Sequence, residues 1–149
     1  MRTIQMLVSL KIPDATALSA LQALHEMGFK RLKSLERSIH YEFQVSGDER
    51  KFQESIKKAD ILVNSNKHTA TFSVQKNIKK IAVLVEDREQ GSAMLSNLRE
   101  RLGFSQIKTM RSGVLWMFSI NGKNPKDLAK KMTKELLSNP HYQKYIVVK

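Results

Sequence analysis

The chain ends in KKMTKELLSNPHYQKYIVVK, residues 130–149, and contains IKKADILVNSNKHTATFSVQ at residues 56–75. Each stretch has the pattern of an amphipathic helix, a turn that carries asparagine, and a short run rich in β-branched residues. The same local pattern therefore occurs twice. This repetition predicts an internal duplication.

Other segments repeat at an offset of about 75 residues. LHEMGF ends at Phe29 and RERLGF ends at Phe104, and MLVSL at 6–10 corresponds to IAVLV at 81–85. A longer alternating run also repeats: Ile39, Tyr41, Phe43 and Val45 correspond to Val114, Trp116, Phe118 and Ile120. The loop NGKNPKD is longer than its counterpart SGDERK by one residue. We therefore predict two copies of one domain, residues 1–75 and residues 76–149.

Each copy predicts the order strand, helix, strand, strand, helix, strand. The first helix ends at Gly28 or Gly103, because a left-handed backbone at a helix end favours glycine. A tight turn is expected to join a short strand to a longer one; these strands are Leu32–Leu35 and Ile39–Val45, then Ile107–Met110 and Val114–Ile120. The predicted fold class is α+β, with two tandem ferredoxin-like βαββαβ units, antiparallel sheets, and helices on one face.

The composition favours a globular intracellular protein. Hydrophobic residues make up 41% of the chain, which is sufficient for a packed core, and there are 0 cysteines to form disulfides. No apolar run approaches the ~18 residues of a membrane span. The N-terminal residues lack the features of a signal peptide. We therefore expect a cytoplasmic location and no membrane partner.

The net charge of +12 is unevenly distributed. Residues 1–75 carry 11 basic and 8 acidic side chains (+3), whereas residues 76–149 carry 15 and 6 (+9). The densest basic cluster is Lys76, Lys79 and Lys80. A nucleic acid, an acidic protein or a phosphorylated ligand would suit such a charge, but we favour a basic surface that is merely solvated, because the lysines are scattered over helix faces and loops.

The sequence contains no recognisable catalytic pattern. Four histidines are spread along the chain without metal-ligand spacing: His25, His40, His68 and His141. Glu86, Asp87 and Glu89 could hold Mg²⁺, but acids before a helix more often act as capping charges. No phosphate-binding loop or nucleophile elbow is present. We predict no catalytic, cofactor-binding or metal-binding residues, no cofactor, and no activity of the isolated chain.

Residues 80–149 resemble the small PurS-type subunit of formylglycinamidine ribonucleotide (FGAM) synthetase. The resemblance rests on LGF followed by IKTMRSG, an alternating strand, and KELLSNPHYQKYIVV. Its most specific part is the Leu-Leu-x-Asn-Pro turn, which is followed by Tyr142 and Tyr145. The first copy shares the layout through VSLKIPDATALSALQALHEMGFKRLKSL, so the chain resembles two PurS units in tandem.

The chain departs from the family at several points. The family usually opens its first helix with Asp-Pro-Gln-Gly, whereas these positions read PDATALSA and DREQGSAM here. A lysine usually follows the glycine at Gly113, and Val114 takes its place. Family members are typically single-unit and often acidic, whereas this chain is doubled and basic.

The resemblance implies a non-catalytic subunit of purine biosynthesis. Such a subunit bridges a glutaminase subunit and an ATP-dependent synthetase subunit of FGAM synthase and helps ammonia to pass between them. Two other functions stay open from the residues alone. One is a basic α+β module that binds nucleic acid, and the other is a regulatory domain that binds a small metabolite.

The sheet face opposite the helices differs between the copies. In the first copy it is mostly polar, whereas in the second it is apolar, which is unusual for an exposed surface. We predict that two chains form a homodimer through this face, with a partner subunit or the first copy as the alternative cover. The candidate interface residues are Leu84, Leu115, Met117 and Val147.

Overall fold

The computed structural model describes residues 1–73 and 79–148. The predicted boundary between residues 75 and 76 therefore lies outside the described residues. Lys76, a member of the predicted basic cluster, lies outside them as well.

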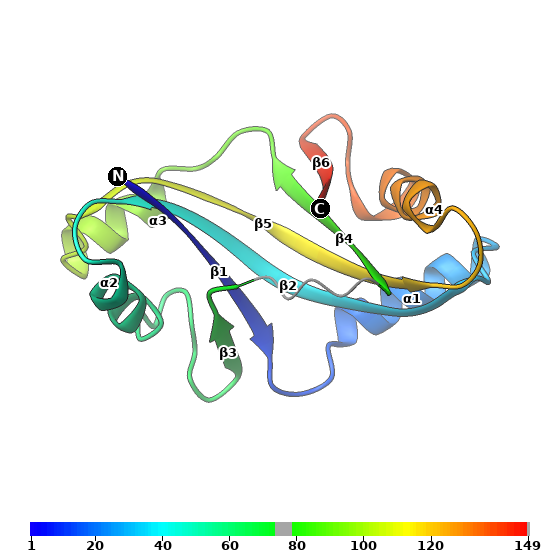
Figure 1. The fold of residues 1–149 in the computed structure, drawn as a ribbon, viewed down its shortest axis with the longest axis horizontal. Helices are drawn as coiled ribbons and strands as arrows, with labels where there is room; N and C mark the ends of the chain where they lie inside the picture. The colour runs from blue at the N-terminus through cyan, green and yellow to red at the C-terminus, as the bar shows by residue number, and fades with distance from the viewer. Residues whose placement is uncertain (74–78, 149) are drawn as a thin grey trace. The chain divides into compact units, whose positions relative to one another are not determined.

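The described residues form six strands and four helical segments, two of which end in a π-helical part (Figure 1). The elements are β1 (Arg2–Leu10), α1 (Ala15–Glu26), β2 (Leu32–Val45), α2 (Glu49–Ile56), β3 (His68–Thr71), β4 (Lys80–Asp87), α3 (Ala93–Ser96), the π-helical η1 (Asn97–Arg101), β5 (Ile107–Ile120), α4 (Pro125–Met132), the π-helical η2 (Thr133–Leu137) and β6 (Gln143–Val148). Hydrogen-bonded strands follow the order β3-β1-β2-β5-β4-β6. The predicted α+β class with antiparallel strands is confirmed.

The predicted tight turns are wrong. Figure 1 shows β2 and β5 as unbroken strands, and each is 14 residues long. The residues expected to form the turns are extended and make contacts with neighbouring segments. Arg37 pairs with Asp14 at 3.0 Å, and Glu36 pairs with Lys80. Gly113 lies opposite Glu86 in the β4–β5 ladder.

Gly113 stands where β4 comes very close. A Cβ atom built there would lie 2.6 Å from the backbone oxygen of Val85. The glycine therefore permits close strand approach rather than a turn, a common reason for glycine inside a strand. Glycine occurs both in turns and at such close approaches, so the residue alone does not distinguish the two.

The chain divides into two compact units that do not follow the sequence copies. Unit 1 is Met1–Ile12, Ile39–Val74 and Glu89–Ser112, and unit 2 is Pro13–Ser38, Gln75–Arg88 and Gly113–Lys149. The long strands β2 and β5 each contribute one half to each unit. Every unit therefore has four strand segments and two helical segments, the content of one ferredoxin-like βαββαβ unit. In unit 1, the helical segment α3–η1 and the first half of β5 come from the second sequence copy. In unit 2, helix α1 and the first half of β2 come from the first copy.

The core of unit 1 joins both sequence copies. Alternate residues of β1 face the helices, and Leu98, Phe104 and Ile107 join them from the second copy. Phe52 of α2 makes edge contacts with Phe43 and with Phe104, at ring-centroid distances of 5.4 and 6.1 Å. Burying each such side chain is worth roughly 1.5–3 kcal/mol. The first copy alone would lack a large part of this core.

The core of unit 2 is mixed in the same way. Val83, Val85, Trp116 and Phe118 form its sheet side, with Ala129 and Met132 of α4 above them. The remaining buried residues come from the first copy: Ala17, Leu24, Phe29, Leu32 and Leu35.

Helix α1 of unit 2 begins at a capping carboxylate. The side chain of Asp14 accepts hydrogen bonds from the amides of Thr16 and Ala17, at 2.9 and 3.1 Å. Burial acts to raise the pKa of Asp14, but the Arg37 guanidinium and these amides outweigh it, so this pKa lies below its usual value. The cap and the ion pair together fix α1 to the first half of β2.

The two repeated stretches form the same turn. The amide of Asn64 donates to His68 Nδ1 at 3.0 Å, and the backbone oxygen of Asn64 accepts from the His68 amide at 2.7 Å. The amide of Asn139 donates to Gln143 Oε1 at 2.9 Å, and its backbone oxygen accepts from the Gln143 amide at 2.7 Å. Both turns lead into the last strand of their copy, which is compatible with the predicted duplication.

Candidate functional site

Three of the four histidines make hydrogen bonds that hold the fold together. His25 Nε2 lies 2.6 Å from the backbone oxygen of Leu32, and His68 belongs to the turn described above. His40 is buried, with Nε2 3.2 Å from Gln5 Oε1. His141 is exposed and packs against a tyrosine ring. The structure does not bring these residues together.

The acidic cluster at the end of β4 has a structural role at one position. Asp87 accepts a hydrogen bond from Gln143 Nε2 at 3.1 Å, which ties the end of β4 to the start of β6. Within residues 1–73 and 79–148, no group of three or more potential ligands could hold a metal ion.

The candidate interface is less exposed than expected. Leu84 is 8% exposed and Leu115 is 1% exposed within the chain itself. Met117 is half-buried. A second chain would therefore meet Met117 rather than the two leucines on this face.

The predicted position of Val147 is wrong. Val147 lies opposite Val83 in the β4–β6 ladder and packs against the core of unit 2 beneath the helices. Ile146, opposite Leu84, lies on the other face and is 56% exposed. Because side chains alternate along a strand, an error of one residue in register moves every side chain to the other face.

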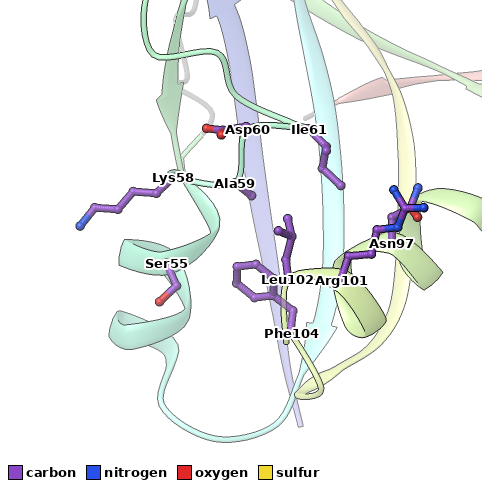
Figure 2. A pocket seen from close by; sticks show the side chains of 9 residues that line it. All are labelled: Ser55, Lys58, Ala59, Asp60, Ile61, Asn97, Arg101, Leu102 and Phe104. Carbon is purple, nitrogen blue, oxygen red and sulfur yellow. The ribbon is translucent and has the colours of Figure 1, made fainter.

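A pocket of about 500 Å³ opens in unit 1 (Figure 2). One wall is the loop after α2, and the other is η1 with the turn that follows it. The side chains of Leu102 and Phe104 extend from the second wall into the pocket. Ile61 reaches toward them from the loop, whereas Lys58 points away. Arg101 and Asn97 lie together on η1 at the opposite side. The surface of the pocket is mainly apolar, and polar residues stand on both walls: Ser55, Lys58 and Asp60 on the first, and Asn97 and Arg101 on the second.

Backbone hydrogen bonds explain the shape of the first wall. The amides of Leu62 and Val63 both donate to the backbone oxygen of Ala59, at 2.9 Å. This tight turn buries Ala59, Leu62 and Val63 and leaves Ile61 44% exposed at the pocket. The second wall contains wider helical turns. The amide of Leu102 donates to Asn97 O at 3.3 Å, five residues earlier.

The size and lining of this pocket suit an apolar guest. Ligand pockets are typically about 300–1,000 Å³ and mainly apolar, with few polar groups. Phe104 lines the pocket and is largely buried, whereas Leu102 is 45% exposed. Such a pocket can receive an apolar side chain of a partner or the apolar body of a ligand. The π-helical segment η1 fits this interpretation, because such segments occur frequently at functional sites.

The fold and its pockets define a small α+β protein whose content is compatible with two ferredoxin-like units. Residues 85–149 match the family model of PurS, described as phosphoribosylformylglycinamidine (FGAM) synthase. The PurS resemblance predicted from the sequence is confirmed over these residues. No curated protein matches the chain.

The most specific part of the PurS resemblance lies between η2 and β6. Asn139 holds this segment together, because its side chain accepts from the His141 amide at 3.0 Å and its backbone oxygen accepts from the Tyr142 amide at 3.1 Å. Tyr145 of β6 is half-buried against the core of unit 2.

Among the described residues, no helix is long and apolar enough to cross a membrane.

Proposed function

We propose that this protein is a PurS-like, non-catalytic subunit of FGAM synthase in purine biosynthesis. It bridges the glutaminase and synthetase subunits of that enzyme in the cytoplasm. The match of residues 85–149 to the PurS family carries the proposal. The resemblance of the first copy to the same layout extends it to the rest of the chain.

The pocket of unit 1 offers one place for a partner subunit to bind. Binding energy at protein interfaces is concentrated in a few anchors that fill well-packed pockets. Ile61 and Leu102 are both large, apolar and nearly half exposed, so an apolar anchor would remove them from water. Arg101 and Asn97 could then form hydrogen bonds at the edge of the contact.

A binding assay with the purified subunits tests this proposal. The intact chain is expected to co-elute with a glutaminase and a synthetase of FGAM synthase in size-exclusion chromatography. Leu102→Asp is expected to weaken this binding by about tenfold or more, since a buried charge at an anchor costs over 1.4 kcal/mol.

Leu18→Asp provides the matched control, because Leu18 is 55% exposed on α1 of unit 2 and lies outside the pocket. Failure of the intact chain to bind either subunit would contradict the bridging role. If Leu102→Asp and Leu18→Asp weaken binding equally, the bridging role stands, but the pocket of unit 1 is not the binding site.

Self-association through the open face of unit 2 is also part of the proposal. Met117, Ile146 and Val148 are apolar residues of this face that a second chain could reach. Met117→Glu is expected to convert a dimer to a monomer in sedimentation at micromolar concentration, because pairing would bury the new charge. Glu42→Lys should not change the mass. A folded Met117→Glu variant with the mass of the unchanged protein would place the interface elsewhere.

A further inference from the structure

A second pocket, of about 210 Å³, lies in unit 2 beside the turn that leads into β6. Three basic side chains line it: Arg88 after β4, Lys134 on η2, and Lys144 on β6. Ser138 and Tyr145, whose side chains carry hydroxyl groups, also line it. None of the lining residues is acidic, which distinguishes this pocket from the one in unit 1.

Local hydrogen bonds hold Arg88 at this pocket. Its amide donates to the backbone oxygen of Tyr142 at 2.7 Å, and its Nε donates to the backbone oxygen of Pro140 at 3.3 Å. These bonds tie the guanidinium to the turn while its terminal nitrogens remain available as donors. Arginine fixed in this way suits planar, bidentate recognition of an oxyanion.

Two acidic residues lie near the pocket without lining it. Glu86 is opposite Lys144 in the β4–β6 ladder, and Asp87 accepts a hydrogen bond from Gln143 Nε2. Three positive groups around a small space repel one another, and a bound anion relieves this repulsion.

We propose that this pocket binds a phosphate monoester. A phosphate group carries close to two negative charges at neutral pH and offers three acceptor oxygens, which match three cations and two hydroxyl donors. A carboxylate has half that charge and fewer acceptors. The pocket has room for the phosphate and a short organic body. This inference does not rest on the proposed role in FGAM synthase.

Titration calorimetry of the full chain with glycerol 3-phosphate tests the site. We expect saturable binding of one ligand per chain, with acetate binding at least about tenfold more weakly because of its lower charge. Arg88→Gln and Lys134→Gln should each weaken phosphate binding by about tenfold or more, in line with the loss of one charge-assisted hydrogen bond.

Lys126→Gln is the matched control, because Lys126 is exposed at the start of α4 and does not line the pocket. It removes the same single charge from a basic protein. An unchanged affinity in Lys126→Gln supports the site. Equal weakening in all three variants, acetate binding as strong as phosphate binding, or no saturable binding would overturn it. Unchanged thermal midpoints show that the variants are folded.

Discussion

The two halves of the chain, residues 1–75 and residues 76–149, should each fail to fold as a closed monomer when they are produced separately. Leu98, Phe104 and Ile107 would be missing from the core of unit 1. The core of unit 2 would lose its buried residues from α1 and the start of β2. At roughly 1.5–3 kcal/mol for each large side chain, these losses approach the whole 5–15 kcal/mol stability of a typical domain.

Circular dichroism and sedimentation of the separate halves check this expectation. Each half alone should be unfolded or self-associated. Mixing the halves should give a 1:1 complex with the thermal unfolding transition of the intact chain. Two folded monomeric halves would contradict the exchange of segments between the copies.

The intact chain with a protease site inserted between residues 75 and 76 is the control. After cleavage, the two fragments should stay together, because each compact unit contains segments of both. Separation of the fragments without unfolding would show that the units follow the sequence copies instead.

The class of fold could be predicted because its signals are local. Alternating apolar residues mark the strands, and the spacing of apolar residues marks the helices. Gly28 and Gly103 were expected to end helices, and both have positive φ angles, of 102° and 75°. These features depend only on neighbouring residues, so one sequence is enough to recognise them.

The exchange of segments could not be predicted from the same signals. If residues 36–38 and 111–113 formed turns, the first helix of each copy would pack on the strands of its own copy. Because these residues stay extended, that helix packs on strands of the other copy. Arg37 and Gly113 fit both conformations locally, and their contacts with Asp14 and β4 decide between them. Local propensity is a weak prior that tertiary contacts override.

Both pockets depend on contacts that local patterns do not contain. The pocket of unit 1 joins residues 55–61 to residues 97–104, which belong to different copies. Ile61 and Leu102 were the available signal, since both are large apolar residues near the ends of predicted helices. The basic pocket of unit 2 brings Arg88, which follows β4, together with residues of η2, the turn after it and β6. All of its lining residues except Arg88 lie within the repeated stretch 130–149 that suggested the fold.

The proposed role depends on a coupling between two partner subunits. A bridge that holds a glutaminase beside a synthetase raises the local concentration of the ammonia that passes between them. Ammonia supplied from solution does not need that bridge. The proposed role therefore predicts that the chain is needed when glutamine supplies the ammonia and is not needed when ammonium is supplied.

Reconstitution of FGAM synthesis from purified glutaminase, synthetase and this chain tests the function most directly. Omitting the chain should reduce glutamine-driven FGAM formation by at least about tenfold, since the local concentration advantage is lost, and should leave ammonium-driven formation unchanged. Equal glutamine-driven rates with and without the chain would contradict the proposed function.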